Sequence, residues 1–196
     1  MSSTSPANPH LQIINAPSRT PALGAKSIFL AGTTSPTSTG DWRLELLALL
    51  SSSLSLSPSA SSSSSSTSSA PIPTPLTIYN PLRPDWDATW REDINFAPYR
   101  EQVEWELDMQ EAADIVVVYF HPETKAPISL LELGLCARRE GRGKGGGVVV
   151  VCPEGYWKRG NVQIVCRRFG VQIVDDVRAL RDAVMERVAG GVSDAS

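Results

Sequence analysis

The sequence predicts an α/β fold, a single doubly wound domain in which helices cover both faces of a five-stranded parallel sheet. Short apolar segments alternate along the chain with segments of helical length, as they do where helices connect parallel strands. The runs at 115–120 and 148–152 are apolar throughout, which is typical of strands buried on both faces. Right-handed crossovers then give 2-1-3-4-5 as the simplest strand order.

The composition of the chain indicates which classes of protein it can belong to. The chain has 196 residues and a net charge of −3, which suits one domain with a real core. Its mild acidity argues against a nucleic-acid polymer as partner, and it has no apolar run long enough to span a membrane. The N-terminus does not have the pattern of a secretion signal, and an odd number of cysteines fits a reducing compartment, so we expect a cytoplasmic protein.

The domain is expected to cover 26–190, with two polar tails and one insertion. Residues 1–25 are rich in Ser, Pro, Thr and Asn and are expected to be disordered, as is the short tail 191–196. The tract 51–75 is dominated by serine and cannot bury a core. We interpret it as a disordered surface insertion, which stability tolerates because closure entropy grows slowly with loop length.

The strands are expected where short apolar runs are bounded by Gly, Pro or polar residues. In chain order they are 27–31, 76–79, 115–120, 148–152 and 171–174. The helices are expected at 42–50, 99–113, 130–139, 159–169 and 177–188. Asp41 is a candidate N-cap for the first helix. The glycine-rich turn 141–147 is not followed by Gly-Lys-Ser/Thr, so we interpret it as a flexible connection.

One carboxylate stands out in this arrangement. Glu132 is expected in the first turn of the helix 130–139, beside the carboxyl end of a central strand, where open α/β sheets bind ligands. The loops 32–40 and 121–129 would face each other there across a crevice. Helix N–H groups and the helix dipole would favour the ionised carboxylate, and a fixed carboxylate can attack the anomeric carbon of a sugar.

Several motifs occur in a specific order and spacing. They are IFLAG at 28–32 with DW at 41–42, NPLRPDW at 80–86, QVEWE at 102–106, AD at 113–114, PISLLELG at 127–134, and CPEGYW at 152–157 with GNV at 160–162. From about residue 27 to residue 188, without the serine tract, the chain therefore resembles the nucleoside 2-deoxyribosyltransferase-like family. Each motif alone is weak, and their combination is specific.

The resemblance implies a double displacement on nucleosides. A glutamate attacks C1′ of a 2′-deoxynucleoside, the base leaves, and a second base or water takes the sugar. Glu132 matches that nucleophile. Glu106 stands eight residues before Asp114, where typical members carry an aspartate that handles the base. The chemistry needs no cofactor and no metal, and the cysteines and histidines show no metal-ligand spacing.

The resemblance also suggests a set of substrate-binding residues. They are Gly32, Asn80, Arg83, Asp85, Trp86, Gln102, Ser129 and Asn161. Trp86 is placed to stack on a base, and Asp85 to hydrogen-bond the sugar or the base. Asn161 matches a residue that in typical members reaches the active site of a neighbouring subunit, which implies a homo-oligomer.

The sequence departs from the family pattern near the sugar. Phe29 occupies the position of a tyrosine that orients the nucleophile, and Ala126 that of an aspartate near the sugar hydroxyls. Ser129 and Thr124, helped by Lys125, could instead bind a 5′-phosphate at the helix N-terminus, as in related nucleotide hydrolases.

Three functions follow from the sequence. The leading one is N-glycosyl transfer on nucleosides or deoxynucleosides through a covalent glycosyl-enzyme. The second is hydrolysis of the N-glycosidic bond of a nucleoside or a nucleoside 5′-monophosphate. The third is non-catalytic binding of a nucleoside or nucleotide, for which Glu132 would not be required.

Overall fold

The computed structural model describes residues 10–35, 37–56, 75–140 and 147–190. Most of the serine tract, most of the glycine-rich turn, the first nine residues and the tail 191–196 lie outside the described residues.

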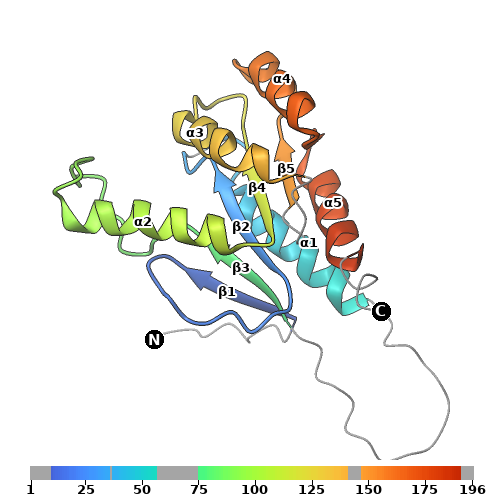
Figure 1. Ribbon diagram of the computed structural model, residues 1–196, viewed down its shortest axis with the longest axis horizontal. Coiled ribbons are helices and arrows are strands. Elements are labelled where there is room, and N and C mark those ends of the chain that lie inside the picture. The colour runs from blue at the N-terminus through green and yellow to red at the C-terminus, as the bar shows by residue number, and fades with distance from the viewer. Residues whose placement is uncertain (1–9, 36, 57–74, 141–146, 191–196) are drawn as a thin grey trace, which may run out of the picture.

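A six-stranded parallel sheet forms the centre of the molecule (Figure 1). Its strands are β1 (Leu11–Asn15), β2 (Ser27–Gly32), β3 (Leu76–Asn80), β4 (Ile115–Tyr119), β5 (Gly147–Val151) and β6 (Gln172–Val174). They lie in the order β1-β3-β2-β4-β5-β6. The five predicted strands are β2 to β6, and their predicted order 2-1-3-4-5 is confirmed within the sheet.

The edge strand β1 corrects the prediction that the whole of 1–25 is disordered. It pairs in parallel with β3, with Ile13 opposite Ile78, and Leu76 N–H donates to the carbonyl of His10 at 2.9 Å. Ile14 is buried on the sheet. The run Leu11–Asn15 is short and lies in a polar segment, so its order depends on hydrogen bonds to β3 that composition does not reveal.

Five helices flank the sheet. They are α1 (Trp42–Leu56), α2 (Ala97–Ala112), α3 (Pro127–Cys136), α4 (Arg159–Phe169) and α5 (Val177–Gly190), and a short 3-10 helix η1 (Ala137–Arg139) follows α3. Helices α2, α3 and α4 cover one face, and α1 and α5 cover the other (Figure 1). None of the helices in the described part of the chain is long and apolar enough to cross a membrane.

Helix α1 runs six residues past its predicted end and into the serine tract. The hydroxyls of Ser52, Ser53 and Ser55 donate to main-chain carbonyls four residues earlier, at 2.8 to 2.9 Å. These bonds satisfy the serine hydroxyls within the helix. Residues 51–56 are therefore helical, which corrects the predicted start of the insertion.

The two faces of the sheet bury separate clusters, because successive strand residues point to opposite faces. Phe29 and Val116 pack with Trp105 of α2 and Leu133 of α3. The cluster under α1 and α5 contains Ile28, Val117, Leu46 and Leu180. The strands are thus buried on both faces, and the sheet is a rigid base for the loops at its carboxyl edge.

The loops after β2 and β4 meet at that edge, as predicted. The main-chain N–H of Ser38 donates to Glu123 at 2.9 Å, and the Thr39 hydroxyl lies 3.2 Å from Nε2 of His121. The end of β2 is therefore held beside the turn that leads into α3.

Candidate active site

Glu132 lies in the second turn of α3, because that helix begins at Pro127 and not at the predicted Leu130. Proline is well suited to the first helical position, where its missing N–H has no partner to lose. The residue before it, Ala126, takes a left-handed conformation with φ 44° and turns the chain into the helix. The helix dipole acts mainly within the first turn, so it gives Glu132 little support.

The electrostatics of Glu132 are the reverse of the prediction that its ionised form is favoured. Burial, and after it the charge of Glu106, raises the pKa of Glu132 to about 8. Arg43 and a hydrogen bond from the backbone of Gly32 act in the opposite direction. In the free protein the site therefore favours the protonated carboxyl at neutral pH.

Glu106 comes from α2 and is held by Gln102, one helical turn earlier. Nε2 of Gln102 donates to Oε1 of Glu106 at 2.8 Å and to the carbonyl of Pro81 at 2.8 Å. Burial raises the pKa of Glu106. Two carboxyls thus share one poorly solvated region and titrate as a pair. Both side chains keep partial exposure, which leaves them accessible to a ligand.

Arg43 is the residue of this site that sequence reasoning missed. It lies in the first turn of α1 with 3% exposure, and burial lowers its pKa while Asp41, Glu132 and Glu106 raise it. The sequence does carry a signal for this residue. One face of the helix bears Arg43, Leu46, Leu47 and Leu50, so the pattern places an arginine on an apolar face.

Gly32 joins these groups at the end of β2. Its carbonyl accepts a hydrogen bond from Nη2 of Arg43 at 3.0 Å, and its backbone bonds to Glu132. Gly32 has φ +135°, and a Cβ there would lie 2.6 Å from the carbonyl oxygen of Tyr119. Only glycine fits both the conformation and the close approach to β4.

Replacing Gly32 by alanine is expected to lower the free energy of unfolding by more than about 3 kcal/mol, because the new methyl group meets main-chain atoms of β4 and the backbone is strained. Urea unfolding measures this change. The matched control is Gly134→Ala in α3, where a Cβ meets nothing within 4 Å. Equal stability of the two variants would contradict the close packing of Gly32.

Three other predicted residues have separate positions. Asn80 ends β3, where its Nδ2 donates to Asn15 at 3.0 Å and its Oδ1 accepts from the N–H of Leu82 at 3.2 Å, so it ties strand ends together. Ser129 is buried in the first turn of α3, three residues before Glu132. Asn161 is exposed near the start of α4.

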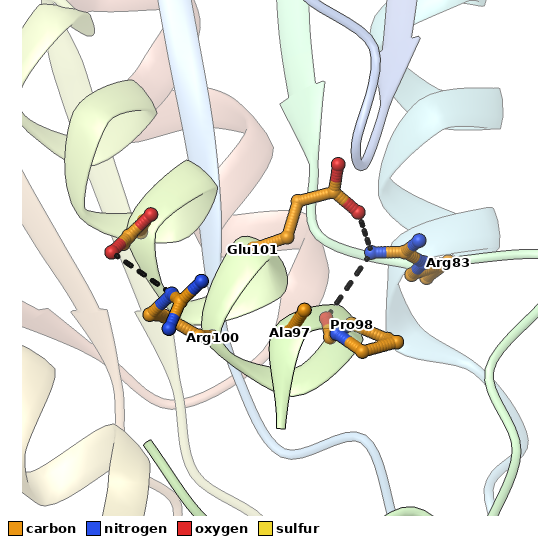
Figure 2. A pocket seen from close by; sticks show the side chains of 6 residues that line it. Arg83, Ala97, Pro98, Arg100 and Glu101 are labelled. Atoms are coloured by element: carbon orange, nitrogen blue, oxygen red, sulfur yellow. Dashed lines mark hydrogen bonds and ion pairs between the residues drawn. The ribbon is translucent and has the colours of Figure 1, made fainter. Parts of the chain in front are cut away.

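The loop after β3 places Arg83, Asp85 and Trp86 in a cluster of their own. Arg83 binds Asp85 at 2.9 Å and Glu101 at 2.8 Å, and Trp86 packs on Trp90 with ring centroids 5.1 Å apart. Arg83 lies beside a cavity of about 350 Å³ at the start of α2, and Figure 2 shows the side chains that line it. This cavity is lined by Arg83, Ala97, Pro98, Arg100, Glu101 and Glu104. No described contact joins these three loop residues to the carboxyl pair.

Of the residues suggested for a 5′-phosphate, Thr124 is committed to the turn before α3, and the main chain of Lys125 is held in the same turn. The hydroxyl of Thr124 is buried and donates to the carbonyl of His121 at 3.0 Å. The carbonyl of Lys125 accepts from the hydroxyl of Tyr156 at 2.8 Å and from the indole of Trp157 at 3.1 Å. Thr124 therefore has no hydroxyl proton left for a phosphate.

Phe29 is buried in β2 and packs against the ring of Trp105, with centroids 6.4 Å apart. It brings no polar atom to the carboxyl pair. Within the described ranges, no group of three or more His, Cys, Asp or Glu residues is arranged to hold a metal ion.

Comparisons with known proteins found a family model and a solved structure that match this chain. The family model described as nucleoside 2-deoxyribosyltransferase like matches residues 25–156. The crystal structure of a conserved protein from Enterococcus faecalis V583 is similar, with a TM-score of 0.51 and 11% sequence identity. The similarity covers 83% of this chain and 98% of that one, and it shows the fold alone. A search of curated proteins found no match.

Proposed function

Since this chain belongs to the nucleoside 2-deoxyribosyltransferase-like family, we propose that it transfers the sugar of a nucleoside or deoxynucleoside between bases, with Glu132 as nucleophile. The observation that carries the proposal is the partly buried carboxyl pair of Glu132 and Glu106, which faces Arg43 at the carboxyl edge of the sheet. Two carboxyls with one proton between them provide a nucleophile and an acid in one site.

In the first half of the reaction, the carboxylate of Glu132 attacks C1′ and forms a C–O bond. The C1′–N bond breaks, and its electron pair leaves with the base. Glu106 gives its proton to that base, so the base departs as a neutral molecule. Burial raises the pKa of Glu106, which favours the protonated form that this step requires.

In the second half, a nitrogen of the acceptor base attacks C1′, and the bond between C1′ and Glu132 breaks. The acceptor base gives a proton to Glu106, which restores the starting state of the pair. If water takes the place of the acceptor base, the same steps release free sugar and the reaction is a hydrolysis.

Gln102 is proposed to bind the substrate directly. Its Nε2 is engaged by Glu106 and Pro81, whereas its buried Oε1 has no hydrogen-bond partner among the described residues. A buried acceptor without a partner is unfavourable, and an N–H or O–H of the substrate would satisfy it. We propose Ser129 as a second contact because it precedes Glu132 by one turn of α3. Gly32, Asn80, Arg83, Asp85 and Trp86 remain sequence predictions.

A homo-oligomer is proposed from the exposed face of α3. Ile128, Leu131 and Leu135 are 56%, 61% and 52% exposed and follow one another on one face of the helix that carries Glu132. A second copy of this chain that covers these side chains would bring a partner helix close to the site. The exposed Asn161 is the residue we propose the partner to contribute.

Replacing Leu131 by glutamate is expected to convert the oligomer into monomers, because the interface would bury a charge without a partner. Light scattering after size-exclusion chromatography measures the mass. The control is Leu44→Glu, since Leu44 is 65% exposed on α1, on the opposite side of the sheet. An unchanged mass for Leu131→Glu would contradict the proposed interface.

Chromatography of a panel of nucleosides and 5′-monophosphates, deoxy and ribo, tests the activity. Each compound is incubated with the purified protein, with and without a second free base. Exchange of bases supports the transferase. Release of base without exchange makes the protein a hydrolase, and binding without turnover makes it a nucleoside-binding protein.

A further inference from the structure

Arg43 is a buried cation whose hydrogen bonds go to main-chain carbonyls. Nη1 donates to the carbonyl of Thr33 at 2.9 Å and Nη2 to that of Gly32 at 3.0 Å. Neutral carbonyls do not cancel a full positive charge, and a buried charge is unfavourable without an opposite one nearby. Its nearest ionic contact is Asp41, at 3.9 Å, on the solvent side of the helix start.

The guanidinium is fixed in place by its surroundings. It lies over the ring of Trp42 at 4.7 Å, and the Trp42 indole donates at 3.2 Å to the same carbonyl of Thr33 that Arg43 binds. Its Nε is buried and has no partner in the part of the chain that the structure describes. Stacking and two carbonyl bonds are a geometry that a lysine does not reproduce.

Gly32 connects this cation to the nucleophile. The carbonyl of Gly32 binds Arg43, and the backbone of the same residue bonds to Glu132. Pairing of β2 with β4 holds Gly32 opposite Tyr119, where a Cβ would meet main-chain atoms of that residue.

We propose that Arg43 is a positioning residue for the nucleophile, whose fixed charge beside Gly32 favours the ionised form of Glu132 against the opposing effects of burial and Glu106. This inference rests on the proposed function only in calling Glu132 a nucleophile. Arg43 is buried and donates to main-chain carbonyls, so the proposed role is exerted through Glu132 and not by contact with the substrate.

The groups that face Glu132 come from four elements. Glu106 of α2 opposes its ionisation, while Arg43 of α1 and the backbone of Gly32 in β2 favour it. Cys136 lies one turn further along α3, and because burial raises the pKa of its thiol to about 12 it stays neutral. Among the described residues, Arg43 is the cation that acts on Glu132.

The test is a carboxyl ¹³C NMR titration of the full chain, with the Glu132 signal assigned from its loss in Glu132→Gln. Arg43→Met is expected to raise the Glu132 midpoint by at least about one pH unit, a tenfold weaker acid. Arg43→Lys is expected to shift it by less than half as much. The matched control is Arg139→Met, because Arg139 also donates to two main-chain carbonyls, those of Gln110 and Ala113.

The control is expected to leave the Glu132 midpoint unchanged. Equal midpoints in the wild type and Arg43→Met would overturn the proposal. If Arg43→Met does not fold above pH 8, where Glu132 ionises, the double variant with Glu132→Gln is expected to fold there, because the carboxylate that Arg43 compensates is gone. If the double variant also fails to fold, Arg43 has a structural role alone. The titration needs no turnover, so a protein inactive on every nucleoside would overturn the proposed function and leave this result readable.

Discussion

Glu132→Gln is expected to lower the rate of base exchange by at least about 10⁴-fold, because the amide cannot form the glycosyl ester on which both half-reactions depend. The fold is expected to persist, since the amide matches the carboxyl in size and the site already favours the uncharged form. Chromatographic assay of exchange with the best nucleoside of the panel measures the rate.

The control for this variant is Glu104→Gln. Glu104 lies two residues before Glu106 on α2, is exposed, and forms a surface ion pair with Arg100. Its loss is expected to change the rate by less than about twofold, because such pairs contribute little. A Glu132→Gln protein that keeps a tenth of the wild-type rate would exclude Glu132 as nucleophile.

The same substitution is expected to stabilise the protein at alkaline pH. The folded protein raises the pKa of Glu132 from 4.5 to about 8, so between these values the folded state holds a proton that the unfolded state releases. In the wild type, the contribution of the Glu132 carboxyl to the free energy of unfolding is fully present below pH 4.5. It is lost as the pH rises through 8. Glu132→Gln removes the penalty, so its advantage grows over that window to a few kcal/mol.

Urea unfolding at several pH values between 4.5 and 9 measures this difference. Glu104→Gln is expected to follow the wild type at every pH. A constant difference between the wild type and Glu132→Gln across the window would show that Glu132 is not held in its protonated form. Such a gain in stability on losing a functional group is typical of active sites that enclose charge.

The strands could be predicted from the sequence because each carries its own signal. β4 and β5 are apolar throughout, and their order follows from right-handed connections. β1 carries no such signal, because its stability comes from pairing with β3. The end of α1 was missed because serines in a helix interior are unfavourable by propensity, and main-chain bonds of the kind made by Ser53 are not visible in sequence.

The candidate site was predictable in part. Glu132, Glu106 and Gln102 come together because they lie on helices α2 and α3, which cover the same face of the sheet. The sequence predicted that the ionised form of Glu132 is favoured, whereas burial favours the protonated form. The helix begins three residues earlier than predicted, so its dipole supports the carboxylate little. Arg83 pairs with Glu101, a contact between loop and helix that spacing does not encode.

The covalent glycosyl-enzyme is tested most directly by mass spectrometry of the protein quenched with acid during turnover of a 2′-deoxynucleoside, followed by peptide mapping. One deoxyribosyl group is expected on the peptide that contains Glu132, absent from the Glu132→Gln protein. Base exchange with the sugar attached to another residue, or with no attached sugar at all, would contradict this expectation.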